Sequence, residues 1–402
     1  MNRLLALLIF SAAFQLQASD WMQFRGPNSG VSEETDLPTV LDAQNSIAWK
    51  STLPGRGISS PIIVGNRVFV TCASGAQQDR LHVICFNAGD GSKRWEREFW
   101  ATGRTTCHEK ISVAAPSPAS DGEHIFALFS SNDLFCLDLD GNLLWLRGLM
   151  RDYPNASNGL GLAASPVVSV GVFVAQIETD GEAFVAGIDV ATGRNLWKIE
   201  RPKKANWTSP QVMKAPSGKS FIILQGSSGV TAIDPTNGTI VWNYTEGAAT
   251  LPTSAIHGDV IFVPSSGVTA IQVNADGGSF KQLWRATQLR TSTPSPLVTR
   301  ERIFTLNDAG VLTCADTVEG KRLWQSRLTA PFSATPVAAG KHLYLVNEKG
   351  LLQIVDASSE DGVITSQLDL GETIIGTPSI SHGGLYLRSD AHLWKIAKVP
   401  TL

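Results

Sequence analysis

One short motif recurs along the chain at a nearly constant spacing. Its clearest copies read Asp-x-x-x-Gly-x-x-x-Trp, and they run from Asp189 to Trp197, from Asp234 to Trp242 and from Asp316 to Trp324. Weaker copies end at Trp95, Trp145 and Trp284. Successive copies lie about 40 to 50 residues apart, which is the period of one supersecondary unit repeated along a chain. The sequence therefore predicts a fold built from stacked copies of one unit.

Each repeat is predicted to form four short strands. The first strand starts after a proline or, in one repeat, after a serine: Pro61, Pro118, Pro166, Pro210, Ser254, Pro296, Pro336 and Pro378. The second alternates apolar and polar residues, as half-buried strands do. Asp-x-x-x-Gly then reads as a turn, because Asp bonds its own backbone and Gly accepts a positive φ. Four antiparallel strands repeated eight times predict an all-β, eight-bladed β-propeller.

The two ends of the chain are predicted to complete the last blade together. The last repeat, from Pro378 to Ile396, has no fourth strand after it. The segment from Ile47 to Lys50 precedes the first repeat and contains Trp49. We expect this N-terminal strand to close the last blade, because a ring must hide its exposed strand edges. The seventh repeat departs from the motif, since Ser366 stands where Trp is expected.

The N-terminus has the layout of a secretory signal peptide. Basic Met1-Asn2-Arg3 precedes an apolar run from Leu4 to Phe14, and a polar exit follows with Ala18 as the cleavage point. The run is too short to cross a bilayer, and a buried helix is the alternative. The predicted organisation is a signal peptide at 1–18, an N-terminal extension at 19–44 and the propeller at 45–402. The product is expected to be periplasmic or secreted, with no membrane span.

Charge and cysteine content exclude further classes of protein. The net charge is −3 and the longest basic run is Lys203-Lys204, which argues against a nucleic-acid partner. Cys85, Cys136 and Cys314 fall at a small, buried third-strand position, where cysteine acts as an apolar filler. A cross-strand disulfide between Cys72 and Cys85 is the alternative. The trio Cys107-His108-Glu109 lacks the ligand spacing of a metal site, so no metal is predicted.

The repeat tail resembles the tryptophan-docking motif of quinoprotein, or PQQ-type, propeller repeats. The resemblance runs from about Trp49 to Ile396. It implies eight blades, with each tryptophan packed against the neighbouring blade near its glycine turn. The structural docking residues would be Trp49, Trp95, Trp145, Trp197, Trp242, Trp284 and Trp324. The opening Trp21 to Pro27 resembles the start of exported bacterial PQQ-like propellers. The single-ring plan is similar to the BamB-like outer-membrane assembly proteins, whose anchoring cysteine this chain lacks.

The enzymatic branch of this resemblance is the quinoprotein dehydrogenases. They are similar in using adjacent cysteines over the cofactor and a calcium ion held by carboxylate and amide groups. This sequence has no Cys-Cys pair and no Cys-x-x-Cys-His haem motif. Because a shared fold does not imply a shared cofactor, none is expected here, and PQQ with calcium is the alternative.

Candidate binding residues lie in the connections that a propeller brings to one channel mouth. Loops on a rigid ring usually carry its function. The long connections 105–115, 152–161 and 203–209, and the one at 290, supply the candidate ligand-binding set: His108, Lys110, Asn155, Asn158, Asn206, Trp207 and Arg290. Cations beside amides and a tryptophan suit an anionic or sugar-like ligand. No nucleophile elbow, phosphate loop or zinc-protease helix is present, so no catalytic residue is predicted.

Two functions remain open from the sequence. The first is a non-enzymatic binding or scaffold module, acting as a monomer on a protein or glycan partner in the periplasm or cell envelope. The second is a quinone-dependent oxidoreductase of the PQQ type, or another small-molecule enzyme, at the channel mouth. A carboxylate-lined pocket for a flat ligand would favour the enzyme, and a channel plugged by side chains would favour the scaffold.

Overall fold

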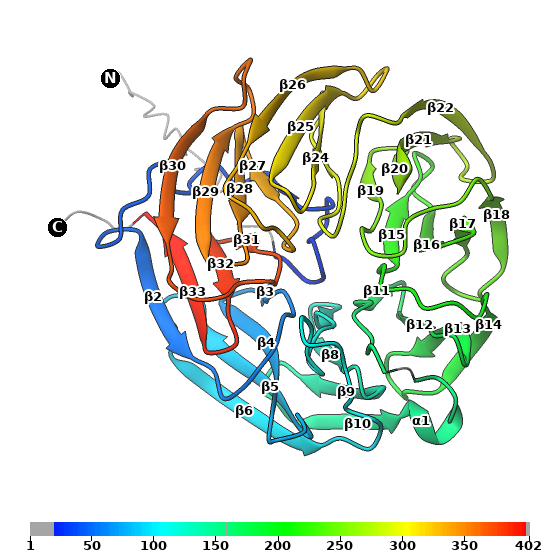
Figure 1. Ribbon diagram of the computed structural model, residues 1–402. Coiled ribbons are helices and arrows are strands. Elements are labelled where there is room, and N and C mark those ends of the chain that lie inside the picture. Colours follow the sequence, from blue (N-terminus) through cyan, green and yellow to red (C-terminus); the bar gives the residue numbers. More distant parts are fainter. Residues whose placement is uncertain (1–19, 158, 399–402) are drawn as a thin grey trace, which may run out of the picture.

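Eight antiparallel sheets stand in a ring, each contributing one blade (Figure 1). The structure, a computed structural model, describes residues 20–157 and 159–398. The predicted fold class, an all-β eight-bladed propeller with four-stranded blades, is confirmed. The predicted signal peptide lies outside the described residues. Helix is confined, within the described ranges, to the single turn α1 (Leu149–Asp152), and no helix there is long and apolar enough to span a bilayer.

Each blade is a four-stranded antiparallel meander. Blade 1 consists of β3 (Ile62–Val64), β4 (Arg67–Ser74), β5 (Arg80–Asn87) and β6 (Lys93–Trp100), and blade 2 of β7 (Ala119–Ser120), β8 (His124–Leu128), β9 (Asp133–Asp138) and β10 (Leu143–Gly148). Blade 3 consists of β11 (Val167–Ser169), β12 (Val172–Glu178), β13 (Ala183–Asp189) and β14 (Asn195–Glu200), and blade 4 of β15 (Gln211–Lys214), β16 (Ser220–Gly226), β17 (Gly229–Ile233) and β18 (Ile240–Tyr244).

The remaining blades follow the same plan, and two strands come from the N-terminal part of the chain. Blade 5 consists of β19 (Ala255–His257), β20 (Val260–Ser265), β21 (Gly267–Val273) and β22 (Phe280–Ala286), and blade 6 of β23 (Leu297–Val298), β24 (Arg302–Leu306), β25 (Val311–Asp316) and β26 (Arg322–Arg327). Blade 7 consists of β27 (Val337–Ala339), β28 (His342–Val346), β29 (Leu351–Asp356) and β30 (Ile364–Asp369), with β1 (Val31–Ser32) added in parallel. Blade 8 consists of β31 (Ser379–Ser381), β32 (Gly384–Arg388), β33 (His392–Ala397) and β2 (Ile47–Thr52).

A chain of hydroxyl groups joins the blades around the channel. The residue at one equivalent position just before each innermost strand is a buried serine or threonine: Ser60, Ser117, Ser165, Ser209, Thr253, Ser295, Thr335 and Thr377. Each of the first seven donates its backbone N–H to the hydroxyl of the next, at 2.8–3.1 Å. We name this set the hydroxyl ring. Its hydroxyls accept hydrogen bonds from buried backbone amides that lie outside the strand pairing. A buried amide needs such a partner, because water cannot reach it.

Tryptophans join the blades farther from the channel. The ring of Trp197 in blade 3 lies so close to Gly238 of blade 4 that a Cβ on Gly238 would come within 2.8 Å of it. Gly238 has a φ of 72°, which glycine adopts without strain. The indole Nε1 of Trp197 donates to Pro235 O at 2.8 Å. Equivalent indole-to-carbonyl bonds are made by Trp49, Trp95, Trp145, Trp242 and Trp284. Every blade except the seventh thus presents its own tryptophan to the turn of the next, and Trp324 does so against Gly362 without a hydrogen-bond partner for its Nε1 among the described residues.

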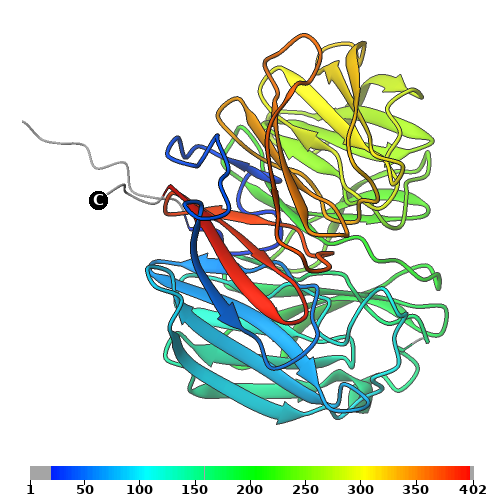
Figure 2. The same cartoon turned by 60° about the vertical axis from the view of Figure 1, so that its left-hand side comes forward.

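The N-terminal strand closes the last blade, as predicted. Strand β2 pairs antiparallel with β33, from Ile47 opposite Ile396 to Thr52 opposite His392, and the two lie side by side in Figures 1 and 2, blue against red. The third-to-fourth turn of blade 8 is therefore replaced by the two chain ends. That explains Ser366 in the tryptophan position of blade 7, since no glycine turn faces it. Its hydroxyl instead accepts the N–H of Leu41 at 2.8 Å.

The segment 20–36, which we name the strap, lines the end of the ring opposite the mouth. Trp21 is fully buried and exchanges two backbone hydrogen bonds with Ile63. Arg25 is 1% exposed, and its guanidinium donates to Ser29 O, Ser254 O and Pro296 O at 2.5–2.9 Å. Burial lowers the pKa of Arg25 to about 9, so it stays charged at neutral pH. The strap is thereby fastened to blades 5 and 6 by one cation.

The alternative of a disulfide between Cys72 and Cys85 is wrong. The two cysteines lie on neighbouring strands, but the register places Cys72 opposite His82 and Cys85 opposite Phe69. Both thiols are free and buried. Burial raises the pKa of the Cys85 thiol to about 12, so it remains protonated and unreactive.

We expect Trp197→Ala to lower the free energy of unfolding by about 3–5 kcal/mol, because it removes a large buried ring and leaves a cavity between two blades. Leu196→Ala is the matched control. Leu196 is the preceding residue of the same strand, is 52% exposed, and should change stability by less than about 0.5 kcal/mol. Urea unfolding measures both. Equal effects at the two positions would contradict the role of the tryptophan.

We also expect the closing blade to weaken in acid through Glu372. Burial alone would raise the pKa of Glu372, but hydrogen bonds from Ser389, His392 and Lys50 outweigh it and lower the pKa to about 2. A carboxylate whose pKa is lowered by folding stabilises the fold fully at pH values above the ordinary pKa of 4.5. This stabilisation is lost as the pH falls from 4.5 toward 2.

Glu372→Gln should therefore melt below the unaltered chain at pH 6. The gap should narrow below pH 4.5 and close near pH 2. Thermal melts of both proteins across that range provide the measurement. A gap of constant size at every pH would show that Glu372 acts through packing rather than through its charge.

Candidate functional site

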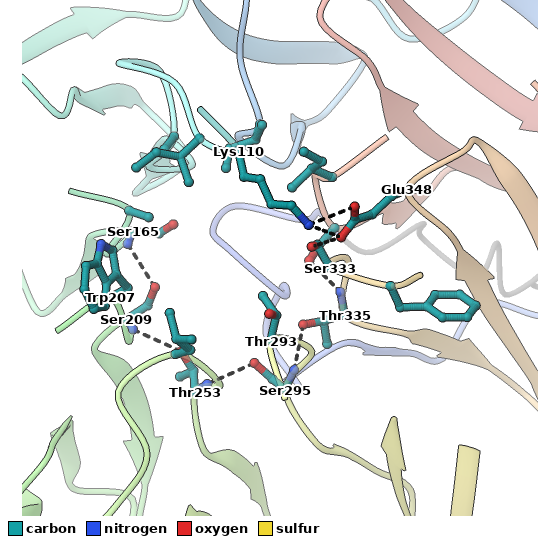
Figure 3. Close-up of a pocket in the computed structure, with 18 of the residues that line it drawn as sticks. Lys110, Ser165, Trp207, Ser209, Thr253, Thr293, Ser295, Ser333, Thr335 and Glu348 are labelled. Carbon is teal, nitrogen blue, oxygen red and sulfur yellow. Dashed lines mark hydrogen bonds and ion pairs between the residues drawn. The ribbon is translucent and has the colours of Figure 1, made fainter. Parts of the chain in front are cut away.

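A cavity of about 730 Å³ opens at one mouth of the ring. Its walls come from the fourth-to-first connections between blades and from second-to-third turns, such as those at Asp308 and Glu348. Most of the wall is apolar: Phe24, Ile58, Ile111, Leu160, Trp207, Leu251, Phe332 and Ile375. Hydroxyl-ring residues also line it, and Figure 3 shows their bonds from Ser165 to Thr335. The cavity is thus an apolar cup with a rim of hydroxyls that are already bonded.

One ion pair joins two non-adjacent blades at this mouth. Lys110, in the connection between blades 1 and 2, places its Nζ 3.2 Å from Oε2 of Glu348, in the β28–β29 turn of blade 7 (Figure 3). Ser333 Oγ donates to the other oxygen, Oε1, at 2.6 Å. The Lys110 side chain is 58% exposed and that of Glu348 is 16% exposed. A pair this open to water contributes at most about 1 kcal/mol, so it can break when a ligand competes.

Trp207 forms part of the same wall and is held from behind. Its indole Nε1 donates to Gly161 O at 3.0 Å, and its backbone N–H donates to Thr250 O at 2.9 Å. The side chain is half-buried, and Figure 3 places it beside Ser165 and Ser209. Because both its polar group and its backbone are engaged, Trp207 offers the cavity its apolar ring.

The structure brings three of the seven candidate binding residues together. His108, Lys110 and Trp207 all line the mouth cavity. Asn155 is exposed but lies outside the lining, against Gly181, and Arg290 is likewise exposed and outside it. Asn158 falls outside the described residues.

Asn206 is buried beneath the mouth. It is 3% exposed, and its side-chain amide donates to Glu178 Oε2 and Gln225 O at 2.8–2.9 Å. Glu178 in turn pairs with Arg201 at 2.7 Å. Asn206 therefore stabilises the connection that carries Trp207, and its amide is not free for a ligand.

Three features of the mouth were not found from the sequence. Glu348 and Ser333 lie more than 200 residues from Lys110 along the chain, and no local pattern connects them. Phe24 comes from the strap, and it lines both the mouth cavity and the opposite one, so its ring stands between them. The hydroxyl ring does have a signal in the sequence, namely a serine or threonine directly before the residue that marks each first strand, such as Ser117 before Pro118.

A second cavity, of about 800 Å³, lies at the opposite end of the ring. The strap forms one wall, with Met22, Phe24 and Arg25, and connections of blades 2 to 5 form the other. Phe24 lines both cavities, so the strap reaches from the far end of the ring to the floor shared with the mouth cavity.

The described residues contain no group of three or more His, Cys, Asp or Glu side chains placed to hold a metal ion. Cys107 is half-buried, and its thiol contacts Gln78 Nε2 at 3.7 Å. Burial raises the pKa of the Cys107 thiol, which disfavours the thiolate that a metal requires.

Comparison with known families places most of the propeller in a known repeat family. The sequence profile of a PQQ-repeat family described as outer membrane protein assembly factor BamB matches residues 26–208, 161–261 and 265–365. These three matches together span most of the propeller.

Individual relatives resemble the chain more distantly. A polyvinylalcohol dehydrogenase from Pseudomonas sp is 26% identical over 196 residues, which cover 44% of this chain. The match spans only 27% of that dehydrogenase.

Two solved structures share the fold. BamB from Moraxella catarrhalis superposes with a TM-score of 0.60 at 15% identity, covering 90% of this chain and 97% of its own. A quinohemoprotein alcohol dehydrogenase from Comamonas testosteroni superposes with a TM-score of 0.70 at 13% identity, covering 95% and 81%. At such identities the likeness concerns the fold alone.

Proposed function

The chain belongs to the PQQ-repeat family described as outer membrane protein assembly factor BamB, and from this premise we propose that its mouth face is a non-enzymatic binding module for a protein partner in the cell envelope. Residues 1–18 would direct export as a signal peptide, 19–44 would serve as the extension that closes and plugs the ring, and 45–402 would form the binding propeller. The partner would dock on the mouth face and insert an apolar side chain into the mouth cavity.

The observation that carries this proposal is the state of the polar groups around the cavity. The hydroxyl ring is bonded to backbone amides, Glu348 is bonded to Lys110 and Ser333, and the Trp207 indole is bonded to Gly161. The exposed apolar surface of the cavity comes from residues such as Leu251, which is 50% exposed, and the half-buried ring of Trp207. A cup of this kind accepts the aromatic or aliphatic anchor that dominates many protein interfaces.

The lining does not fit the quinone cofactor of the dehydrogenases. PQQ carries three carboxylates and needs cations around it. Lys110 supplies one positive charge here, and Glu348 already pairs with it. Asp308 adds a second carboxylate to the same wall and accepts a hydrogen bond from Ser292 Oγ at 3.0 Å. Two carboxylates beside one lysine repel a trianion rather than attract it.

A quinone-dependent dehydrogenase remains the second candidate function. The match to a polyvinylalcohol dehydrogenase over 196 residues favours it. Under this alternative the mouth would hold a flat ligand against the ring of Trp207, which lines the cavity.

Site-specific photo-crosslinking in producing cells tests the proposal. A photo-reactive side chain in place of Leu251, which lines the cavity and is 50% exposed, should capture a protein from the envelope. The same group in place of Val318, which is 79% exposed in the β25–β26 turn, is the matched control and should capture none. Leu251→Asp should abolish retention of the captured partner, because an unpaired charge cannot enter an apolar interface.

Other outcomes would contradict the binding module. Equal capture from both positions would mean that the mouth has no special role. If the crosslinked adduct contains glycan instead of protein, the partner is a glycan and not a protein. If position 251 captures nothing and the purified chain melts at a higher temperature with PQQ and calcium, the dehydrogenase is the better account.

A further inference from the structure

Three polar side chains are linked across blade 1, apart from the mouth cavity. Ser74 ends β4, His82 lies in β5 and Glu96 lies in β6. Ser74 Oγ lies 2.7 Å from Nε2 of His82, and Nδ1 of His82 lies 2.9 Å from Oε1 of Glu96. A hydroxyl, an imidazole and a carboxylate are thus joined in series, each through a different ring nitrogen. This is the arrangement that activates serine as a nucleophile on unrelated folds.

The hydrogen bonds themselves fix the tautomer of His82. An ionised carboxylate only accepts hydrogen bonds, so Nδ1 of His82 must carry the proton that faces Glu96. In the neutral ring Nε2 then holds a lone pair, and it accepts the hydrogen bond that Ser74 Oγ donates. The imidazole is therefore set to take a proton from Ser74, which is the role of a general base.

The ionised state of Glu96 has its own support. Burial alone would raise the pKa of Glu96, but hydrogen bonds and charge from Lys93 and His82 outweigh it, and the pKa lies below its usual value. Lys93 Nζ donates to Oε2 of Glu96 at 2.6 Å, leaving Oε1 to His82. Both carboxylate oxygens are thereby held in place.

Burial is greatest at the middle of the series. His82 is 3% exposed, which shields its ring from water, while Ser74 at the strand end is only half-buried. Gly75 follows Ser74 in a left-handed conformation with a φ of 85°, so the chain turns away directly after the hydroxyl. Ser74 at one end of the series and Glu96 at the other, with its side chain 24% exposed, are thus both partly open to solvent, and the imidazole between them is not.

The surface beside Ser74 offers a shallow binding face. Ser74 lies opposite Arg80, and Arg80 lies opposite Trp100, so the three share one face of the sheet. Trp100 is 60% exposed, and the Arg80 guanidinium stacks on its ring. None of the cavities described above includes Ser74. Such a face suits a small substrate that lies on an aromatic edge rather than a long chain held in a tunnel.

A second serine–histidine–glutamate cluster in the same molecule shows a different order. In blade 8, Ser389 Oγ donates to Glu372, and His392 Nδ1 also bonds Glu372. There the carboxylate of Glu372 lies between the other two side chains and accepts the hydrogen bond of the serine hydroxyl directly. Ser389 Oγ therefore faces a carboxylate in place of an imidazole and serves as a matched control within one chain.

We propose that Ser74, His82 and Glu96 form a hydrolytic site for small carboxylic esters. Ser74 Oγ attacks the ester carbonyl and forms an acyl bond while its proton passes to Nε2 of His82. The bond to the alcohol breaks as that proton moves to the leaving oxygen. Water then attacks the acyl-serine and gives its proton to Nε2. Ser74 leaves with that proton, so one ester and one water become one acid and one alcohol.

The direct test is covalent labelling with a fluorophosphonate, followed by peptide mass spectrometry of the purified mature chain. Ser74 should carry the label, and Ser389 should not. The same preparation should hydrolyse p-nitrophenyl acetate, and Ser74→Ala should lose both label and hydrolysis at an unchanged melting temperature. Ser389→Ala should retain both.

Glu96→Gln separates activation from folding. The amide can donate to Nδ1 and so stabilise the wrong tautomer, with the shape of the side chain retained. As a positioning residue, Glu96 should affect kcat, by about 100-fold or more, and leave KM for p-nitrophenyl acetate unchanged. If Ser74 stays unlabelled, or if Ser74→Ala hydrolyses the ester as fast as the unaltered chain, the proposal is wrong.

Discussion

The architecture depends on the hydrogen bonds that pass from blade to blade around the channel. In each of the first seven blades a serine or threonine N–H meets the hydroxyl of the equivalent residue in the next blade. These amides are buried and cannot be satisfied by water, so an unmade bond would cost about 1–3 kcal/mol. The hydroxyl ring therefore sets the spacing of the innermost strands, and this spacing sets the width of the mouth cavity.

A ring of similar units has to be closed by something other than another unit. The N-terminal segment does this twice here, by adding β2 to blade 8 and by running the strap against the far end of the channel. At the seam the pattern changes: Ser60 Oγ is buried with no hydrogen-bond partner among the described residues, and the buried Arg388 bonds Thr71 O of blade 1 instead. The residues that break the repeat, such as Ser366, are those that face the chain ends.

The blades could be predicted from the sequence because their signals are local. A proline before the first strand, an Asp-to-Gly turn and a terminal tryptophan each occupy a few consecutive residues, and the ring follows from repeating them. The mouth could be predicted only in part. His108, Lys110 and Trp207 converge, but Glu348 belongs to a distant turn, and Asn206 is drawn into a buried network. Ser74, His82 and Glu96 escaped notice because they are diagonal neighbours on three strands, which only the register reveals.

Hydrogen exchange at Ser295 in a Thr335→Val variant tests the central role of the hydroxyl ring most directly. Valine keeps the shape of Thr335 but removes the Oγ1 that accepts Ser295 N–H at 3.0 Å. The account predicts faster exchange of the Ser295 amide and a lower melting temperature, while Thr239→Val, at an exposed turn position, changes neither. If the Ser295 amide stays equally protected and the variant melts like the unaltered chain, the ring does not hold the blades together.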